Sequence, residues 1–239
     1  IKLIFTSSIQ VDLNNLYGSS KLEAEKIVKT LSSENRCFVN IFRLPGVFGK
    51  WCKPNYNSVI ATFCYNIARG NPIRIDDPNH KLRLVYIDDV INGLIFSLNE
   101  IIDNELYKTI EPEYSVSLGE LASQIKDFKS SRRDLKIDAV GAGFLKALYA
   151  TFLSYLPSEQ FSYQLQQHID VRGKFVEILK SPTLGQVSYL TINENQERGG
   201  HYHHTKTEKF LVVRGEALFR FRDLLTKDIV ELKASGNDS

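Results

Sequence analysis

The stretch FTSSIQVDLNNLYGSSKLEAEKIV (residues 5–28) decides the fold of this chain. It starts inside an apolar run, residues 1–6, which predicts a buried strand followed by hydroxyl side chains. Residues 17–33 then carry apolar side chains at the spacing of an amphipathic helix. A strand that leads directly into such a helix is typical of an α/β fold.

The segments that follow repeat this alternation of strand and helix. CFVNIFRL (37–44) is an apolar, β-rich run without strict alternation, as expected of a strand covered on both faces. The later elements expected are a helix over 57–69, a short strand over 73–75, a strand at LRLVYI (82–87), and helices at DDVINGLIFSLNE (88–100) and SLGELASQIKDF (117–128). Ser117 is the expected N-cap of the last helix, and Glu120 would complete a capping box. The order predicts a parallel α/β sheet.

The pattern changes after Pro157. Residues 169–239 contain short β-rich runs separated by Gly, Pro and Asn, namely GKFVEIL, GQVSYLTI, EKFLVVRG and EALFRFRD. Such a series is typical of an all-β barrel or sandwich. We therefore expect an α/β domain over 1–130, a helical connector over 131–158 and an all-β domain over 159–239.

Composition and charge exclude several classes of protein. The net charge of +2 gives no electrostatic reason to expect nucleic acid or an anionic membrane as partner. The best candidate for a membrane span, residues 139–156, has Lys146 at its middle, where a charge costs roughly 2.5–3.5 kcal/mol. We interpret this segment as a buried or interdomain helix. The three cysteines form no CxxC pair, which fits reduced thiols and a cytoplasmic location.

Tyr17 and Lys21 stand four residues apart at the start of the first expected helix, so they share one helix face. An ammonium group beside a phenol stabilises the phenolate, which makes the tyrosine a usable proton donor to a carbonyl being reduced. The Y-x-x-x-K spacing alone is weak, because Tyr202 and Lys206 repeat it by coincidence. The alternative is a half-buried tyrosine with a solvated lysine.

The set of Ser8, Tyr17 and Lys21 resembles the extended short-chain dehydrogenase/reductase family, which has a Rossmann-like fold. The resemblance implies that Ser8 holds the substrate oxygen and that Tyr17 protonates it. It also implies that Lys21 assists Tyr17, and that both contact the nicotinamide cofactor.

Two further segments carry the same resemblance. FRLPGVFG (42–49) resembles the family's next strand and the loop beside the nicotinamide, which implies that Leu44 and Pro45 bind the cofactor. LRLVYIDDV (82–90) resembles its late substrate-side strand and helix start.

The family's glycine-rich phosphate turn has no counterpart before this helix. Gly141 and Gly143 precede a later helix, but Lys146 occupies the third glycine position. The chain also lacks methionine, and its first strand would have no preceding neighbour. We therefore expect the C-terminal part of a reductase domain, in a fragment that lacks both ends and does not act as a reductase by itself.

The segment GGHYHHTKTEKFLVVRG (199–215) concentrates potential metal ligands. On a strand, His201 and His203 point to the same side, and Glu208 can return to that interior from the next strand. Two imidazoles and a carboxylate suit zinc or a similar divalent ion. A solvated, histidine-rich hairpin is the alternative.

The pattern H-x-H-x4-E-x6-G, formed by His201, His203, Glu208 and Gly215, resembles the first motif of the cupin family. The resemblance implies a jelly-roll domain that binds a divalent metal, with zinc the expected ion. Residues 216–239 contain no histidine, so the second cupin motif is missing and the barrel is expected to be incomplete. DVRGKFVEI (170–178) also resembles the sugar-nucleotide epimerases with cupin-like barrels.

The combination of reductase and cupin resembles the CapF-type family of capsular polysaccharide synthesis enzymes. FGKWCKPNYNSVIATFCYNIARG (48–70), LSYLPS (153–158) and HHTKTEKFLVV (203–213) carry this resemblance. It implies a bifunctional enzyme of UDP-N-acetyl-L-fucosamine formation and a homodimer through the cupin domain. The cupin would epimerise a UDP-4-keto-6-deoxy-N-acetylhexosamine at C3, and the reductase domain would reduce the C4 ketone with NADPH.

Three residues are candidates for contact with the UDP-linked sugar. Trp51 and Asn55 lie in the KWCKPNYN segment. The Trp51 ring either offers a face on which the substrate stacks or packs against the protein itself. Arg83 could bind the UDP phosphates as a bidentate donor, or be a surface charge on a strand. A non-catalytic sugar-nucleotide- or metal-binding cupin on a degenerate α/β support is the alternative function, and a barrel that serves only dimerisation is a third.

Overall fold

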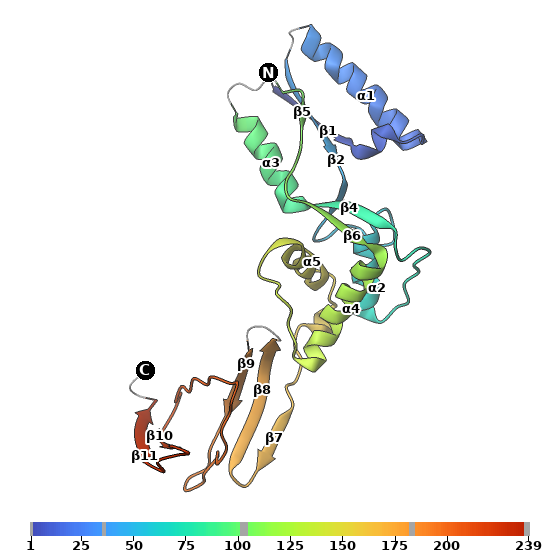
Figure 1. Cartoon of the computed structure of the whole chain (residues 1–239). Helices are drawn as coiled ribbons and strands as arrows, with labels where there is room; N and C mark the ends of the chain where they lie inside the picture. The colour runs from blue at the N-terminus through green and yellow to red at the C-terminus, as the bar shows by residue number, and fades with distance from the viewer. Residues whose placement is uncertain (1, 35–36, 101–104, 182–184, 237–239) are drawn as a thin grey trace. The chain divides into compact units, whose positions relative to one another are not determined.

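The computed structural model describes residues 2–34, 37–100, 105–181 and 185–236. The chain divides into two compact units, Ile1–Asn193 and Glu194–Ser239, which are described separately. The first unit contains an α/β part and an antiparallel β part (Figure 1). The predicted division into 1–130, 131–158 and 159–239 remains a prediction.

The expected alternation of strand and helix is confirmed through the α/β part. Its elements in chain order are β1 (Lys2–Ser8), the 3-10 turn η1 (Ile9–Asp12), α1 (Leu16–Ser33), β2 (Phe38–Leu44), β3 (Gly46–Phe48), α2 (Val59–Arg69), β4 (Lys81–Tyr86), α3 (Ile87–Asn99), β5 (Tyr107–Lys108), β6 (Glu113–Ser117), α4 (Leu118–Asp134) and α5 (Gly143–Leu153).

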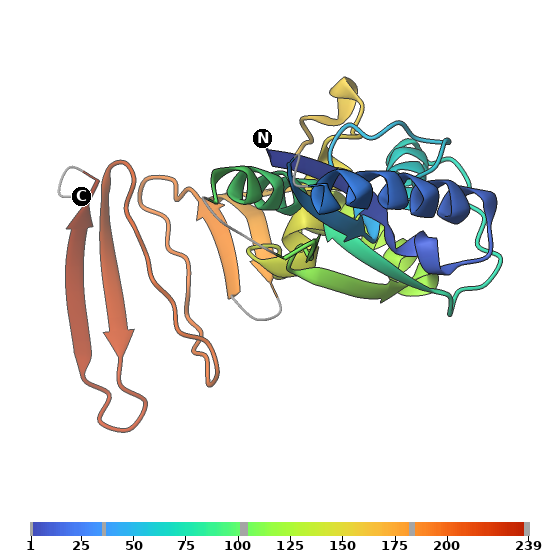
Figure 2. The same ribbon diagram turned by 90° about the horizontal axis from the view of Figure 1, so that it is seen from above.

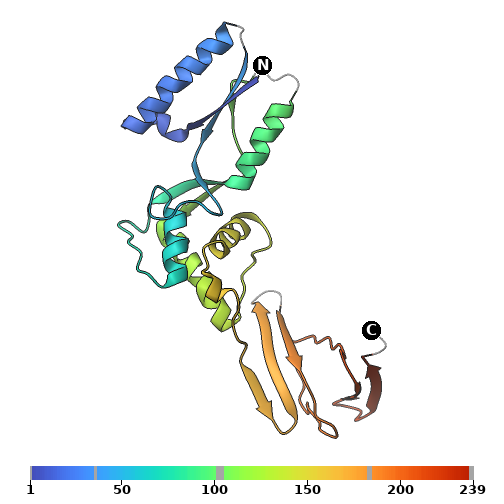
Figure 3. The same ribbon diagram turned by 180° about the vertical axis from the view of Figure 1, so that it is seen from behind.

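A parallel sheet in the order β1-β2-β5 positions the candidate site. β1 and β2 are paired from Lys2↔Phe38 to Ser8↔Leu44, so both strands end at the same edge. Helices α1 and α3 lie on either side of these strands (Figures 1 and 3). The strand pattern without alternation in residues 37–44 therefore correctly predicted coverage on both faces.

A second sheet in the order β3-β4-β6 packs against the main hydrophobic core. β3 pairs with β4 in parallel, whereas β6 pairs with β4 antiparallel. The expected short strand over 73–75 is absent from the described residues. Ile73 and Ile75 instead pack their side chains against this core without joining a ladder. Their apolar character reflects burial and not strand pairing.

Helix α4 begins as the sequence predicts. The Ser117 hydroxyl accepts a hydrogen bond from the Glu120 amide at 3.2 Å, and the Glu120 carboxylate accepts one from the Ser117 amide at 2.9 Å. This capping box satisfies amide groups that the first helical turn leaves unpaired.

Helix α5 is a core element and not a membrane span. Leu148 and Phe152 are fully buried, and they pack among side chains of α2 and α4. Within the described residues no helix combines the length and apolarity needed to cross a membrane. Lys146 lies on this helix at an exposed position, which avoids burial of its charge.

The β-rich part of the sequence forms antiparallel pairs. In the first unit β7 (Gln167–Asp170), β8 (Gly173–Ser181) and β9 (Gly185–Leu190) form a sheet in that order. In the second unit β10 (Glu216–Arg222) and β11 (Ile229–Ser235) form a hairpin, whose strands lie side by side in Figure 2.

One predicted strand is wrong. The segment EKFLVVRG, residues 208–215, contains no strand, and neither does the histidine segment before it. β-branched and aromatic side chains favour an extended backbone, but a strand also needs a hydrogen-bonded neighbour. The jelly roll expected for this region is accordingly not confirmed.

Replacing the buried Leu148 tests whether α5 belongs to the core. We expect Leu148→Ala to lower the free energy of unfolding by about 2–5 kcal/mol, because the lost methyl groups leave a cavity. Leu98→Ala, at a side chain 56% exposed on α3, is the matched control and should cost less than about 1 kcal/mol. Urea unfolding monitored by circular dichroism measures both. Equal effects of the two variants would contradict the assignment of α5 to the core.

Candidate functional site

The candidate site lies where β1 and β2 end at the same edge of the parallel sheet. In parallel α/β sheets this edge, at the carboxyl ends of the strands, is where ligands bind. Ser8 is the last residue of β1, and it is opposite Leu44, the last residue of β2. Both are buried, and Pro45 follows directly. The structure therefore brings together three of the residues that the sequence assigned to one site.

Ser8 also stabilises the turn that directly follows β1. Its hydroxyl accepts a hydrogen bond from the Gln10 amide at 3.2 Å and caps the 3-10 turn η1. A hydroxyl can still donate its own proton while it accepts one bond. Ser8 thus combines a capping role with a hydroxyl that can still donate at the edge of the sheet.

Tyr17 and Lys21 lie on the first turns of α1, close to this edge. The Lys21 ammonium donates to the Thr6 carbonyl of β1 at 3.1 Å, and Nζ lies 5.9 Å from the centre of the Tyr17 ring. The ammonium has three donors, so two remain for other groups. Tyr17 is 52% exposed, and its phenol is therefore accessible from solution. This is the geometry that the Y-x-x-x-K spacing predicts.

Close backbone packing holds the first turn of α1 against η1. The Gly18 amide donates to the Asn15 side-chain oxygen at 2.7 Å, which caps the helix. A Cβ atom at Gly18 would lie only 2.0 Å from the Gln10 carbonyl oxygen. Only glycine therefore allows the helix to start so close to η1, directly after Tyr17.

Trp51 and Asn55 lie on an exposed but well-anchored loop, residues 50–57. Both have left-handed backbones, with φ of 64° and 53°, which is uncommon for residues other than glycine. The backbone amide of Asn55 donates to the Thr62 hydroxyl at 2.9 Å, and the Tyr155 hydroxyl donates to the backbone carbonyl of Cys52. Such strain, held by surrounding contacts, is a feature found at binding sites.

The same loop presents its aromatic rings with cations beside them. Trp51 is 81% exposed, and the Lys50 ammonium lies 5.6 Å from the centre of its ring. Lys50 also donates to Asp88 at 3.2 Å, and this bond is the main reason why the pKa of Lys50 is raised. Lys53 lies 5.5 Å from the Tyr56 ring centre. The loop therefore offers stacking surface and positive charge together.

Arg83 is not free in the structure. Its guanidinium donates two hydrogen bonds to the Glu113 carboxylate, at 2.5 and 2.9 Å, across the antiparallel pair of β4 and β6. These bonds lower the pKa of Glu113 and raise that of Arg83. Of the two interpretations of Arg83, this pairing agrees better with the surface charge on a strand.

The predicted metal ligands are only partly gathered. The ring centres of His201 and His203 are 4.9 Å apart, and His203 Nε2 lies 3.7 Å from Glu208 Oε1. All three residues are exposed and lie outside strands. No group of three or more His, Cys, Asp or Glu side chains that could hold a metal exists among the described residues. The predicted zinc site is therefore not supported, and we derive no chemical step from a metal.

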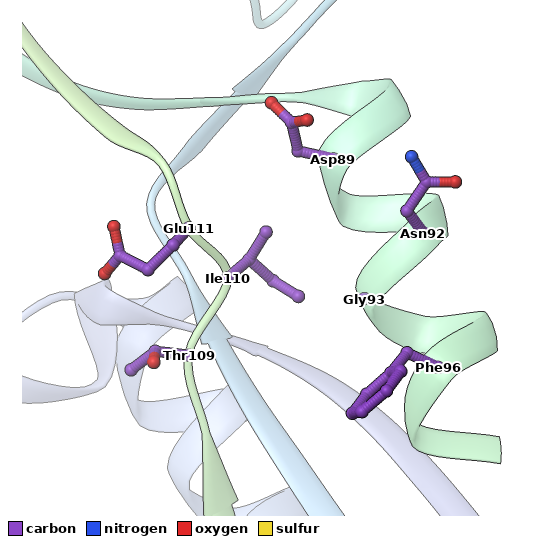
Figure 4. Close-up of a pocket in the computed structure, with 7 residues that line it drawn as sticks. All are labelled: Asp89, Asn92, Gly93, Phe96, Thr109, Ile110 and Glu111. Carbon is purple, nitrogen blue, oxygen red and sulfur yellow. The ribbon is translucent and has the colours of Figure 1, made fainter. Parts of the chain in front are cut away.

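A shallow hollow of about 270 Å³ lies beside α3, away from the predicted residues. Figure 4 shows that Asp89, Asn92 and Phe96 border it from the helix, while Ile110 points toward Gly93 from the facing segment. Burial raises the pKa of Asp89, and the charge of Asp88 adds to this effect. The hollow contains none of the groups that the sequence assigned to catalysis.

Glu25 and Arg43 are the residues near the site that sequence analysis missed. Glu25 is fully buried on α1, and Arg43 precedes Leu44 on β2. Burial alone would raise the pKa of the Glu25 carboxyl. Hydrogen bonds from Arg43, Ser7 and Tyr107 and the charge of Arg43 outweigh this effect, so the pKa is lowered. The available signal was the spacing of Tyr17, Lys21 and Glu25, which repeats every four residues along one helix face.

The strand order and the geometry at the strand ends define an α/β fold of the Rossmann-like type, with an additional β part. Residues 4–110 match the NAD dependent epimerase/dehydratase family. Residues 168–239 match the polysaccharide biosynthesis C-terminal domain.

Particular proteins resemble the chain over nearly all of its length. A UDP-2-acetamido-2,6-beta-L-arabino-hexul-4-ose reductase of Pseudomonas aeruginosa is 48% identical over 236 residues, which cover 99% of this chain and 63% of that protein. The crystal structure of the capsular polysaccharide assembling protein CapF of Staphylococcus aureus is 43% identical, with a TM-score of 0.91. It covers 99% of this chain and 66% of that one. The chain thus spans slightly less than two thirds of the length of either relative.

A more distant structure supports the fold alone. The enzyme WbmF of Bordetella bronchiseptica, solved in complex with NAD+, is 17% identical with a TM-score of 0.52. The match covers 64% of this chain and 58% of that enzyme.

Gly18→Ala tests the close approach at the start of α1. Alanine normally favours a helix, but here its Cβ would collide with the Gln10 carbonyl, and we expect a loss of about 1–3 kcal/mol in the free energy of unfolding. Gly141→Ala is the control, because nothing lies within 4 Å of a Cβ at that position. It should change stability by less than about 1 kcal/mol. Chemical denaturation compares the two, and a stabilising Gly18→Ala would contradict the packing described.

Proposed function

We propose that the α/β part is the ketone-reducing half of an enzyme that acts on a UDP-linked sugar. The observation that carries this proposal is that Lys21 binds the Thr6 carbonyl, two residues before Ser8 at the carboxyl end of β1, with the Tyr17 ring 5.9 Å from its ammonium. An accessible phenol, an ammonium and a hydroxyl at this edge of a parallel sheet can bind and protonate a carbonyl oxygen.

Each of the three side chains has a distinct role in this proposal. The Ser8 hydroxyl donates to the substrate carbonyl oxygen and orients it. The Tyr17 phenol gives its proton to that oxygen as the carbonyl becomes an alcohol. The Lys21 ammonium, held by the Thr6 carbonyl, stabilises the phenolate that Tyr17 becomes.

The residues present at the strand ends fit a nicotinamide cofactor, for which we propose NADPH. Lys21 has two donors beyond its bond to Thr6, which suit the hydroxyls of a ribose. Leu44 and Pro45 form an apolar end of β2 next to Ser8. When bound, the cofactor supplies a hydride to the substrate carbon. Tyr17 supplies the proton, and Ser8 holds the reacting oxygen.

The loop over residues 50–57 is the proposed contact with the nucleotide sugar. Trp51 offers a flat, exposed ring on which a base or sugar can stack. Lys53 places positive charge beside this surface, which suits the negative charge of a diphosphate, whereas Asp88 partly neutralises the charge of Lys50. Asn55, at its strained backbone position, is the polar residue of the loop proposed to bind substrate.

The relatives support a more specific substrate. The Pseudomonas aeruginosa protein is named as a reductase of a UDP-linked 2-acetamido hexulose, and its match covers 99% of this chain. We therefore propose the C4 ketone of a UDP-4-keto-6-deoxy-N-acetylhexosamine as the group reduced, in the formation of a capsular polysaccharide precursor. A homodimer through the β-rich part belongs to the same proposal.

The second unit is proposed to catalyse epimerisation at C3 of the same sugar. Removal of a proton next to a ketone needs a base and groups that stabilise the enolate. His201 and His203 place two imidazoles with ring centres 4.9 Å apart, and the Glu208 carboxylate lies 3.7 Å from His203. The match of residues 168–239 to a polysaccharide biosynthesis domain supports a role on this substrate.

Tyr17→Phe tests the reductase proposal, with the protein at its natural length. The variant keeps the ring but lacks the proton donor, so we expect the rate of NADPH consumption with the keto sugar to fall by roughly 10²–10⁴-fold. Tyr202→Phe, at the second Y-x-x-x-K sequence, is the matched control and should reduce at the normal rate. A Tyr17→Phe enzyme as fast as the wild type would contradict the proposal and favour a non-catalytic binding module.

A double variant, His201→Asn with His203→Asn, tests the epimerase proposal without the reduction step. In D2O the wild type should exchange the C3 proton of the keto sugar for deuterium, which NMR detects with no NADPH present. We expect at least a tenfold loss of exchange in the double variant, because both imidazoles are removed. His204→Asn is the control. Exchange that survives in the double variant would refute a role for this pair.

A further inference from the structure

Glu25 is a completely buried carboxylate on the same face of α1 as Tyr17 and Lys21. It accepts hydrogen bonds from the Ser7 hydroxyl at 2.6 Å, from Arg43 Nε at 3.0 Å and Nη2 at 2.8 Å, and from the Tyr107 hydroxyl at 3.0 Å. These partners belong to β1, β2 and β5. One carboxylate therefore connects helix α1 to each strand of the parallel sheet.

Arg43 is the second centre of this network. Besides its two bonds to Glu25, its guanidinium carbon lies 4.7 Å from the centre of the Tyr107 ring. Its Nη1 lies 3.7 Å from a carboxylate oxygen of Asp12, in the turn between β1 and α1. Arg43 thus contacts both the helix that carries Tyr17 and the turn that leads into it.

The network is adjacent to the candidate catalytic groups in the sheet register. Ser7 is opposite Arg43, and the next pair along the ladder is Ser8 with Leu44. On the helix, Glu25 follows Lys21 by one turn, as Lys21 follows Tyr17. A small rotation or shift of α1 would therefore move the phenol and the ammonium relative to Ser8.

Stability alone does not require charges at this place. Glu25 is fully buried while the Arg43 side chain is 31% exposed, so the carboxylate bears the main cost of removal from water. Apolar side chains of similar volume often replace a buried ion pair without loss of stability. A bidentate guanidinium–carboxylate pair differs from apolar packing in one respect, because its planar fork defines distance and orientation. The pair is thus suited to setting the geometry of the elements that it joins.

We propose that Glu25 and Arg43 are positioning residues for the reduction step. They fix the rotation of α1 about its axis and its position relative to the ends of β1 and β2. Tyr17 and Lys21 are thereby oriented toward a substrate carbonyl that Ser8 binds. The inference depends on the proposed reductase function. It adds a pair, one member fully buried and the other 31% exposed, that touches neither substrate nor cofactor and acts through Tyr17 and Lys21.

The decisive variant is Glu25→Leu with Arg43→Met, which removes both charges and keeps similar volumes. We expect a folded protein whose midpoint of urea unfolding falls only modestly, because the Ser7 and Tyr107 hydroxyls lose their acceptor. We also expect a fall in kcat of roughly 10- to 100-fold, because small misplacements of catalytic groups have effects of this size. The KM for the keto sugar should stay close to its normal value, since the loop over residues 50–57 is untouched. If the pair had only a structural role, kcat would not fall while KM stays constant.

A second readout does not depend on activity. Amide hydrogen exchange of Gly18 and Ser19, which bond to the Asn15 side chain and carbonyl, reports on the first turn of α1. Exchange there should speed up at least tenfold in the double variant. The matched control is Glu23→Leu with Lys26→Met, an exposed pair on the same helix, which should change neither exchange nor kcat.

Arg43→Lys covers the case in which the double variant does not fold. It keeps the charge but loses the fork, so we expect a lower kcat, faster exchange at Gly18 and a normal KM. Normal kcat and normal exchange in a folded double variant, or in Arg43→Lys, would overturn the inference.

Tyr17→Phe in the same assay separates the two proposals. If Tyr17→Phe is inactive while the double variant is fully active, only the positioning role fails. If Tyr17→Phe is active, the reductase proposal fails and the exchange measurement alone decides whether the pair positions α1.

Discussion

The parallel pairing of β1 with β2 is the constraint on which the α/β half depends. Parallel neighbours cannot be joined by a tight turn, so the chain must cross over one face of the sheet, and α1 makes this crossover. Both strands then end at one edge. Because α1 starts soon after β1 ends, its first turns lie close to that edge, where Lys21 binds the Thr6 carbonyl of β1.

The two faces of this sheet differ in chemistry, because side chains alternate along a strand. On one face Phe42 and Leu44 pack with Val90 of α3 in a small apolar core. On the other face Ser7 and Arg43 meet Glu25 of α1. The apolar face contributes burial, and the polar face contributes directional bonds next to the candidate catalytic residues. The sheet is therefore covered on both sides, and directional bonds define the positions of the side chains at the edge where the strands end.

Predictions from sequence succeeded where the signal was local. The capping box of Ser117 and Glu120 and the helix that carries Tyr17 and Lys21 depend on residues a few positions apart. They failed over 73–75 and 208–215, where apolar residues were assigned to strands that do not form. An apolar run indicates burial or an extended backbone, but not whether a neighbouring strand is available. The parallel order of β1 and β2 was predictable, because a helix separates them.

The sequence by itself determined the local elements and the spacing of Tyr17, Lys21 and Glu25 along one helix face. It also placed serine at the end of the first strand. Only the tertiary structure decided that Glu25 is buried and that Arg43, Ser7 and Tyr107 are its partners. The physical reason is that these partners come from different strands, so their meeting depends on the sheet register and on the packing of α1. The spacing of residues in the sequence shows which of them share a helix face. The tertiary fold determines which side chains pack against that face.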